Sequence, residues 1–546
     1  MKAKQKYIQR LFKSYMFPPD KIPLLISNTI LAGYFFGEDG LAVVTLFMPI
    51  YFLFETAGYW INYGGLIKTL EEISNNQPLA RSYSSLSLTL STIAGIILAA
   101  LVLIFFENLL GILAVPEGLK ILAQDYGKFL VVAGFLLLIS FYVWQFVKVI
   151  GLQIRIKKIY VLIMVVDVLG CVLCEKFFGL GIISLVVGMV AAEIFIITFG
   201  GILLRKSFKE NLFGKIQEPI SSAWSLICAG SSVSAGKFYT LFQVYIFNLF
   251  LLKFYGTTGV AIFALLQVAI RICRLHSQVT WQPLPPLLTA ELGDKNISAM
   301  FLIFKTAMKL AIIFAALPAV VIFFGADFLI TQSSLNPAEY NFAADALKTY
   351  SLSVVLAAVN SVFIAVYLSG EHKIFSNVTE FARSIVAVIL FLKFAAPENI
   401  FWSFLFAEGV AAVILVAGIF LLQKTKNYRT LLLLNEKIFC PSCYEIFDYA
   451  EKNWSTDKLA AFLEQQKISS RRALTELENW RQRFEEITPN AKNHFLAVHL
   501  YTEENLLHMT LRDNGNRIER TQQNIKFTLG FNNIYYREDL TKGGDY

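Results

Sequence analysis

The stretch NTILAGYFFGEDGLAVVTLFMP (residues 28–49) sets the plan of this chain, because its pattern returns later in the sequence. The words FFGEDGLA (35–42) and FYGTTGVA (254–261) share their aromatic, glycine and alanine positions and lie 219 residues apart. The similarity continues in register into EISNNQPLA (72–80) and ELGDKNISA (291–299). An internal repeat of this length predicts two halves of similar structure.

The composition places most of the chain in a membrane. Hydrophobic residues make up 56% of the 546 residues and charged residues 16%, whereas soluble domains carry roughly 25% charged residues. The net charge is +8, but in a membrane protein the side on which basic residues lie says more than the total, and we expect no nucleic-acid partner. The basic region 1–21 is interrupted by Pro18, Pro19 and Asp20 and has no small-residue cleavage site, so we expect no signal peptide.

Cysteine usage predicts neither a disulfide framework nor a metal centre. Four of the six cysteines fall in apolar runs, where a thiol is usually part of the packing. Cys440 and Cys443 have a spacing seen in zinc sites, but no second pair and no nearby histidine accompany them.

Apolar runs of about 20 residues, long enough to cross a hydrocarbon core of roughly 30 Å, recur as far as residue 424. Solid apolar runs predict helices rather than strands. We therefore expect an all-α polytopic membrane protein with twelve transmembrane helices in two six-helix, pseudo-symmetric bundles. The predicted spans are 22–36, 41–63, 86–106, 129–150, 159–174, 180–204, 223–252, 260–281, 300–324, 343–368, 375–394 and 401–422.

Basic residues gather in the loops on one side of these spans, for example at Arg81, at 155–158, at 205–215 and after Lys424. The opposite loops hold only scattered lysines. The positive-inside rule then places both termini in the cytoplasm, with the chain crossing the cell inner membrane many times. The predicted domains are a first bundle (1–214), a second bundle (215–430) and a small cytoplasmic α+β domain (435–546).

The composition changes after residue 430 to charged and amphipathic sequence. Apolar residues at helical spacing, such as Leu474, Leu477 and Trp480, predict a helix with one buried face. Alternating segments separated by a polar turn predict a β-hairpin. The predicted elements are helices at 457–466 and 470–487 and strands at 495–501 and 506–511.

The opening stretch resembles the first two helices of the multidrug and toxin extrusion (MATE) family, whose superfamily also includes polysaccharide and lipid-linked sugar flippases. The matching residues are Gly33, Gly37, Glu38, Asp39, Leu41, Ala42 and Pro49. The resemblance implies a secondary transporter rather than an enzyme. Such a protein exports lipophilic or cationic organic solutes by alternating access, in exchange for Na⁺ or H⁺ and without a cofactor.

Asn28 departs from this pattern, because many family members carry a cation-coupling aspartate in the first helix. An amide cannot take up and release a proton near neutral pH, and it offers a cation only a neutral oxygen. The coupling mechanism therefore does not transfer directly, and Asp167, the most isolated carboxylate of the first half, could bind the proton or cation instead.

An ionisable side chain in the middle of a membrane costs on the order of 2.5–3.5 kcal/mol, so it needs water, a partner or a function. In addition to Asn28, the candidate solute- and cation-binding residues are Asp167, Glu193, Lys237, Arg271, Arg274 and Glu408.

Each candidate also has a structural interpretation. Glu193 and Glu408 occupy equivalent places in the two halves and could face a central cavity or serve helix packing. Asp167 could pair with Lys237, and the arginines could extend to the membrane surface or pair with Glu55. Glu380 and Arg383, three residues apart, predict an internal salt bridge.

The C-terminal region resembles the ATP-binding domain of histidine-kinase-like and anti-sigma-factor proteins. Asp513-Asn514-Gly515 is similar to the adenine-contacting motif of that domain, and Leu529-Gly530 is similar to its later glycine motif. Glu478 matches the acidic residue of the nucleotide-binding helix, but Gln482 stands in the place of the magnesium-binding asparagine, and Arg517 replaces a glycine. These departures favour a degenerate domain without nucleotide over a working ATP site.

Three functions remain open at this point. The first is an exporter with a membrane-embedded site for an organic solute and a coupling cation. The second is a flippase for a lipid-linked sugar or other amphiphile, for which Lys237, Arg271 and Arg274 could hold phosphate. The third is a membrane-anchored regulatory or nucleotide-sensing protein, whose C-terminal domain could bind a cytoplasmic protein partner. No GxxxxGK[ST] motif occurs, so we do not expect an ATP-driven motor of that kind.

Overall fold

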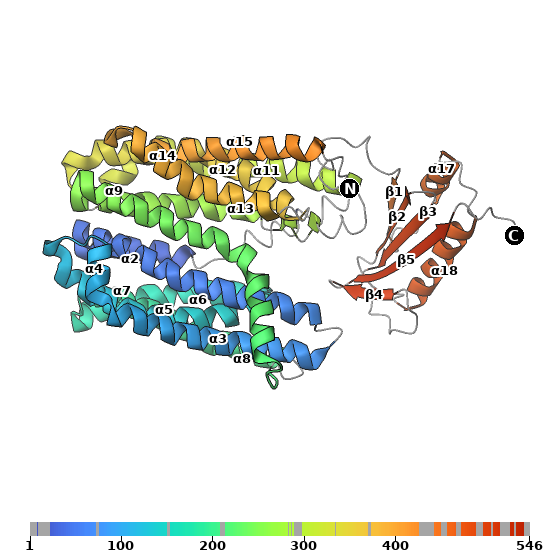
Figure 1. Cartoon of the computed structure of the whole chain (residues 1–546), viewed down its shortest axis with the longest axis horizontal. Helices are drawn as coiled ribbons and strands as arrows, with labels where there is room; N and C mark the ends of the chain where they lie inside the picture. Colours follow the sequence, from blue (N-terminus) through green and yellow to red (C-terminus); the bar gives the residue numbers. More distant parts are fainter. Residues whose placement is uncertain are drawn as a thin grey trace.

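Helices dominate the computed structural model, and element labels follow Figure 1. The structure describes residues 8, 22–72, 76–149, 153–207, 213–281, 283–285, 287–288, 297–333, 335–369, 373–424, 442–448, 456–465, 471–487, 495–503, 506–513, 525–528 and 531–539. The two chain termini, Cys440, Gly515, Arg517 and the Leu529-Gly530 pair lie outside these residues, so the predictions about them stay predictions.

The helices up to residue 207 correspond to the first predicted half. They are α2 (Ile22–Glu72), α3 (Gln77–Ile104), α4 (Phe106–Ile112), η1 (Glu117–Leu119), α5 (Lys120–Val149), α6 (Gln153–Leu173), η2 (Cys174–Phe178), α7 (Ile183–Phe195), η3 (Ile196–Gly200) and α8 (Gly201–Ser207). The first turn of α3 is fixed by Asn76, whose side chain accepts a hydrogen bond from the amide of Leu79 at 3.2 Å.

The helices from residue 219 to 424 correspond to the second predicted half. They are α9 (Pro219–Trp281), α11 (Ile297–Thr331), η4 (Pro337–Glu339), α12 (Tyr340–Ser369), α13 (Lys373–Phe381), η5 (Ala382–Val386), α14 (Ala387–Phe394), η6 (Pro397–Asn399) and α15 (Trp402–Lys424). Three of the short segments, η2, η3 and η5, are π-helical turns that continue a longer helix.

The longest helices, α2 and α9, each contain one glycine in a non-helical conformation. Gly37 has φ 62° and ψ −146°, and Gly256 has φ 62° and ψ −152°, a region that is essentially limited to glycine. A Cβ atom on Gly40 would lie 2.8 Å from the carbonyl oxygen of Ala32, although residues eight apart in a straight helix are roughly 12 Å apart. The chain therefore folds back at Gly37, and the same contact pattern recurs after Gly256.

The surface of the helical region is apolar and its interior holds polar contacts. Within the described residues, nine helices are long and apolar enough to cross a membrane. Ile93 and Ile97 of α3 are exposed, whereas Ser87 and Ser91 of the same helix are buried and donate to Asn62 Oδ1 on α2 at 3.0 and 2.9 Å. This arrangement is typical of helices that pack through small polar residues and face lipid with the opposite side.

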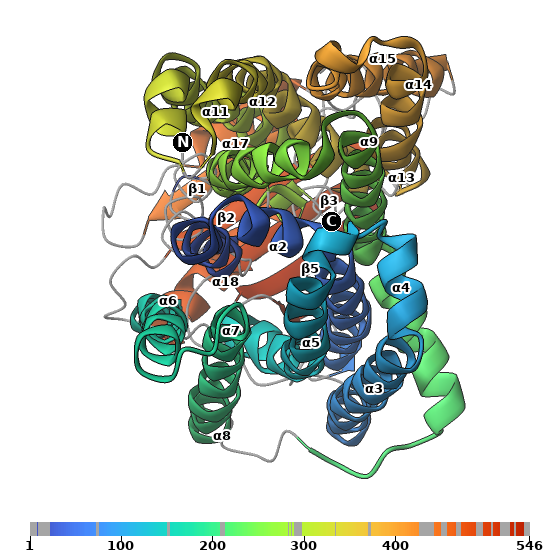
Figure 2. The same ribbon diagram turned by 90° about the vertical axis from the view of Figure 1, so that its left-hand side faces the viewer.

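The helices form two groups, which Figures 1 and 2 show as a blue-to-teal group and a yellow-to-orange group. The green helix α9 lies between them, and among the described helices its contact with α2 is the most extensive. The largest hydrophobic core cluster includes Phe47 and Phe54 of α2 together with Phe247 and Phe263 of α9.

The described strands after residue 441 form one antiparallel sheet in the order β1-β2-β3-β5-β4. The strands are β1 (Ser442–Asp448), β2 (Phe495–Glu503), β3 (Leu506–Asp513), β4 (Ile525–Thr528) and β5 (Phe531–Asp539), and the helices are α17 (Asp457–Gln465) and α18 (Arg471–Ile487). Leu477 of α18 belongs to a buried cluster with Val498 of β2 and Met509 of β3. The predicted hairpin is confirmed, since Glu503 pairs with Leu506 across the turn.

Candidate functional site

Asp167 lies in the middle of α6 and is 1% exposed. Ser27 Oγ on α2 donates to its Oδ2 at 2.5 Å. Its other oxygen, Oδ1, is buried and has no hydrogen-bond partner among the described residues. Asp167 also forms no ion pair within the described part of the chain. One oxygen of the Asp167 carboxylate is thus hydrogen-bonded, and the other has no hydrogen bond within the described residues.

Asn28 lies beside this carboxylate, next to Ser27 in the chain. Its Nδ2 donates to the carbonyl oxygen of Leu185 on α7 at 3.1 Å, which orients the amide. Its Oδ1 is buried and, within the described residues, has no partner. Two unsatisfied oxygens, one carboxylate and one amide, therefore lie where α2, α6 and α7 meet. Oxygen ligands of this kind suit a small hard cation.

Small residues bring α6 and α7 close together around Asp167. A Cβ on Gly188 would lie 2.5 Å from the Asp167 carbonyl oxygen and 3.2 Å from its Oδ1. A Cβ on Gly170 would lie 3.1 Å from the Gly188 Cα. Close backbone approach at small residues is a common way to pack membrane helices. Here it packs α6 and α7 tightly against each other next to the Asp167 carboxylate.

Glu193 is the second buried carboxylate of the first half, 2% exposed on α7. Ser140 Oγ of α5 donates a short hydrogen bond to its Oε2. Asp167 and Glu193 lie on α6 and α7, which pack closely against each other, and two nearby carboxylates repel each other when both are charged. Protonating one of them, or placing a cation between them, would relieve this repulsion.

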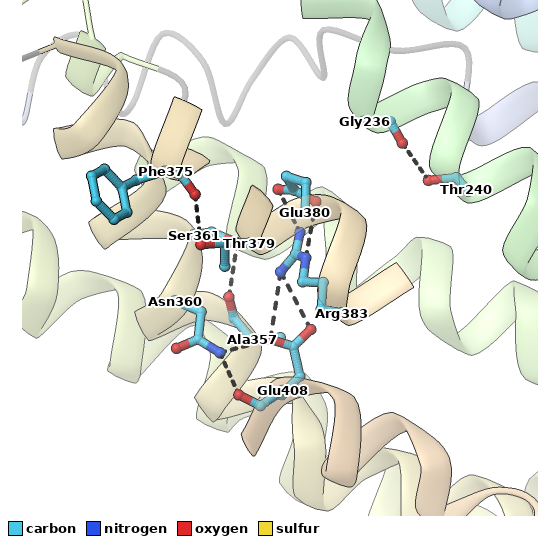
Figure 3. Close-up of polar contacts among 10 residues, drawn as sticks. All are labelled: Gly236, Thr240, Ala357, Asn360, Ser361, Phe375, Thr379, Glu380, Arg383 and Glu408. Atoms are coloured by element: carbon cyan, nitrogen blue, oxygen red, sulfur yellow. Dashed lines mark hydrogen bonds and ion pairs between the residues drawn. The ribbon is translucent and has the colours of Figure 1, made fainter. Parts of the chain in front are cut away.

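The second half holds a denser polar cluster, drawn in Figure 3. Arg383 of η5 contacts both oxygens of Glu380, with Nε–Oε2 at 2.9 Å and Nη2–Oε1 at 2.8 Å. Its Nη1 reaches the Glu408 oxygens of α15 at 3.3 and 3.4 Å. Asn360 Nδ2 of α12 donates to Glu408 Oε2 at 2.8 Å. The salt bridge predicted from the spacing of Glu380 and Arg383 is present, and Arg383 also pairs with Glu408 on a second helix, α15.

Lys237 and Glu55 connect the two halves of the chain. Lys237 Nζ on α9 lies 2.9 Å from Glu55 Oε1 on α2, and it also lies 4.9 Å from the centre of the Tyr59 ring. The Glu55 side chain is 6% exposed and that of Lys237 27% exposed. The suggested pair between Asp167 and Lys237 is wrong, because the chain places Lys237 beside Glu55.

The two arginines of α9 differ in their surroundings, although they lie three residues apart on one helix. Arg271 is buried, and its Nη1 donates to the Leu25 carbonyl oxygen and to Thr29 Oγ1, both at 3.2 Å. It therefore fixes α9 to the start of α2. Arg274 is exposed and makes no ion pair or side-chain hydrogen bond within the described residues. Neither guanidinium forms the suggested salt bridge with Glu55, because Lys237 forms that contact.

Glu193 and Glu408 each accept a hydrogen bond from another helix of the same half. Glu193 accepts a hydrogen bond from Ser140 on α5, and Glu408 accepts one from Asn360 on α12. Ser27, Ser140 and Asn360 were missed by reasoning from ionisable residues alone. Their signal was present, since each is a hydrogen-bonding side chain within an apolar run.

The residues suggested for nucleotide binding are described only in part. Glu478 is half-buried on α18, and Gln482 is exposed on the same helix. Asp513 is the last residue of β3, where it pairs with Leu496 of β2. Thr528 of β4 pairs with Phe531 of β5.

The fold is shared with solved membrane transporters. An inward-facing MATE-family multidrug resistance transporter of the MOP superfamily matches with a TM-score of 0.67 and 17% identity, over 77% of this chain and 99% of that one. A substitution variant of the Vibrio cholerae MATE transporter VcmN matches with a TM-score of 0.61 and 16% identity, over 79% and 100%.

A MOP-superfamily transporter from Pyrococcus furiosus, described as having a binding pocket of reverse polarity that suggests a different function, matches with a TM-score of 0.58. Its identity is 16%, and the match covers 79% of this chain and 99% of that one. No protein-family model matches the chain, and no curated protein matches its sequence.

The apolar helices and this structural likeness define a multi-pass membrane protein. Its helical region has the fold of MATE transporters. The prediction of a multi-pass helical membrane protein with a MATE-like fold is therefore confirmed.

Proposed function

We propose that this chain is a MATE-type secondary transporter that exports an organic solute in exchange for Na⁺ or H⁺. The observation that carries this proposal is Asp167, a buried carboxylate with one oxygen held by Ser27 and the other without a partner among the described residues. The shared fold supports the transport function, and Asp167 supports cation coupling.

The chemistry of Asp167 favours an exchangeable cation. A buried charge without a counter-charge is costly, and within the described residues no ion pair neutralises this one. A proton or Na⁺ would supply the missing charge, and Asn28 Oδ1 would add a neutral oxygen ligand. Binding and release of that cation would then change the free energy of the contacts between α2, α6 and α7.

The proposed architecture has twelve spans: the chain folds back at Gly37 and Gly256, so the nine long apolar helices of the described residues give eleven spans, and α6 is the twelfth. Domain 1–214 and domain 215–430 would move against each other about the α2–α9 contact. Both termini and the region 435–546 would lie in the cytoplasm, with the helices in the inner membrane. The organic solute would bind between the halves.

A flippase for a phosphate-bearing amphiphile is the second candidate, and exposed Arg274 is the observation in its favour. The other two basic residues suggested for phosphate binding are engaged elsewhere, Lys237 by Glu55 and Arg271 by the start of α2. The buried carboxylates favour a cationic solute, so substrate charge separates the two candidates.

The C-terminal region supports a role in protein contacts rather than a nucleotide-dependent role. Gln482 replaces the magnesium-binding asparagine expected from the resemblance, and Arg517 replaces a glycine. We expect the purified full-length protein to show no heat of ATP or ADP binding by calorimetry. Binding that Asp513→Ala removes would instead support the nucleotide-sensing function.

The decisive experiment measures efflux of a fluorescent organic cation from proteoliposomes under imposed Na⁺ or H⁺ gradients. Parent protein should show gradient-driven efflux, and Asp167→Asn should lower it about ten- to hundredfold, in line with losing one charged ligand. Asp327→Asn, an exposed carboxylate of α11, is the matched control and should keep parent activity. Absence of transport by the parent, or unchanged efflux in Asp167→Asn, contradicts the proposal.

A further inference from the structure

The four residues Asn360, Glu380, Arg383 and Glu408, here called the Arg383 cluster, are joined by hydrogen bonds and ion pairs around the Arg383 guanidinium. Figure 3 shows the Arg383 side chain between the two carboxylates, with Asn360 on the far side of Glu408. Contacts of 2.8 and 2.9 Å with Glu380 give the parallel two-bond geometry that guanidinium forms with carboxylate. The Glu408 contacts at 3.3 and 3.4 Å are longer, so Glu408 is the less firmly paired carboxylate.

The backbone helps Arg383 to reach both carboxylates. Arg383 belongs to η5, a π-helical turn between α13 and α14. A π-helical turn adds a residue to the helix and changes the direction of the side chains around it. Glu380 lies one turn before Arg383 on the same helix, and Glu408 comes from α15. The π turn therefore lies at the place where one cation must meet carboxylates from two helices.

The first half differs at the corresponding place. The repeat offset of 219 residues aligns Asp167 with Val386, which is three residues from Arg383. The fifth predicted helix of the first half thus carries a buried acid, Asp167. The fifth predicted helix of the second half carries a base, Arg383, within three residues of the aligned position. Asp167 has no ion pair among the described residues, whereas Glu408 has Arg383 within 3.4 Å.

We propose that Arg383 is a built-in cation that permanently fills a cation site of the second half. Glu380, Glu408 and Asn360 form this site, and a free guanidinium or a small inorganic cation would bind there if the arginine side chain were absent. The second half then exchanges no cation, and the molecule carries one exchangeable cation, in the first half. The statement about exchange rests on the proposed function, but the guanidinium site does not.

The test is chemical rescue of the full-length protein in detergent, followed by thermal unfolding. Arg383→Ala should unfold at a lower temperature than the parent, and millimolar guanidinium chloride should recover at least half of that loss. Urea is the matched control because it has nearly the same shape without the charge, and choline chloride controls for ionic strength. Neither should stabilise the variant, and guanidinium should not stabilise the parent.

Adding Glu408→Gln to Arg383→Ala should remove the response to guanidinium, since one carboxylate of the site is then neutral. Rescue by urea equal to that by guanidinium, or equal stabilisation of parent and variant, overturns the proposal. These readouts do not depend on transport, so they remain valid even if Asp167 does not couple cation movement to solute transport.

A second measurement covers the case in which Arg383→Ala does not fold. Arg383→Gln keeps most of the side-chain volume and removes the charge. Binding of radioactive Na⁺ to Arg383→Gln should show one more site per chain than the parent, and Glu408→Gln should remove that extra site. An unchanged number of Na⁺ sites in Arg383→Gln overturns the proposal.

Discussion

Three carboxylates of the helical region, Glu55, Glu408 and Asp167, carry their charge in different ways. Glu55 is paired with Lys237 across the two halves, and Glu408 is paired with Arg383 within one half. Asp167 has only the Ser27 hydroxyl on one oxygen and, among the described residues, no basic partner. The chain itself neutralises Glu55 and Glu408, whereas Asp167 leaves room for an exchangeable cation.

The pair Glu55–Lys237 should stabilise the contact between the halves. Lys237→Met would leave Glu55 buried without this partner, and we expect a loss on the order of 2 kcal/mol. Breaking a buried pair costs about 3–5 kcal/mol, and the partial exposure of Lys237 lowers that figure. Adding Glu55→Gln should restore part of the loss, which a double-mutant cycle on thermal unfolding measures.

Lys348→Met is the matched control for this cycle. Lys348 pairs with Asp327, whose side chain is 69% exposed, so the change should stay within about 0.5 kcal/mol. Equal effects of Lys237→Met and Lys348→Met would contradict the importance of the buried pair, as would a double variant no more stable than Lys237→Met.

At the scale of elements, α2 and α9 approach each other through glycine. A Cβ on Gly64 would lie 2.0 Å from the Leu226 carbonyl oxygen, and a Cβ on Gly230 would lie 1.9 Å from the Trp60 carbonyl oxygen. Trp60 Nε1 also donates to the Ile227 carbonyl oxygen at 2.8 Å. These reciprocal contacts connect the first turns of α9 to the first half of the chain.

Gly230→Ala should therefore force the two helices apart, with a loss of about 1–3 kcal/mol, the usual cost of overpacking. Gly236→Ala is the control on the same helix, because no atom lies within 4 Å of its added Cβ. It should be neutral or stabilise by up to about 1 kcal/mol through helix propensity. The measurement is thermal unfolding of both variants, and equal stability of the two would show that the close approach does not matter.

The position of the helices could be predicted from the sequence, but their ends could not. The predicted span 41–63 lies in α2, which continues to Glu72, and the predicted span 86–106 lies in α3, which begins at Gln77. The early part of α3 contains Ser82, Ser84 and Ser87, whose low hydropathy hides it from a search for apolar runs. These serines are buried, and Ser84, for example, bonds to Tyr142 Oη at 2.6 Å.

The ionisable residues of the candidate site and the local pair Glu380–Arg383 could be predicted from the sequence, but the pairs between distant helices could not. Burial of Asp167, Glu193 and Arg271 follows from their position in apolar runs. The choice of Glu55 as the partner of Lys237 depends on the depth and rotation of α2 and α9, which are set by packing such as the Gly64–Gly230 contact. The π-helical turn at Arg383 likewise depends on tertiary structure, since local sequence does not mark the extra residue.

For the whole molecule, the repeat seen in the sequence becomes a shared backbone feature. Gly37 and Gly256 have nearly the same φ and ψ values, and each folds the chain back at the same point of its half. The residues after these glycines meet, because Thr258 Oγ1 donates a short hydrogen bond to Glu38 Oε1. The two halves therefore touch at the ends of their first hairpins, as well as at Glu55–Lys237 and Gly64–Gly230.

This contact allows a test of movement between the halves. If transport requires the hairpin ends to separate, a short bismaleimide that joins Glu38→Cys to Thr258→Cys should lower efflux at least tenfold, since it would block a rigid-body movement of one half against the other. The control pair Asp327→Cys/Lys348→Cys joins α11 to α12 within the second half, so cross-linking there should leave efflux unchanged. Parent protein treated with the same reagent accounts for its own cysteines, of which Cys228 is exposed. Full efflux after complete cross-linking of 38 to 258 would mean that the hairpin ends stay together throughout transport, and the movement would then have to occur at the opposite ends of α2 and α9, where Gly64 and Gly230 meet.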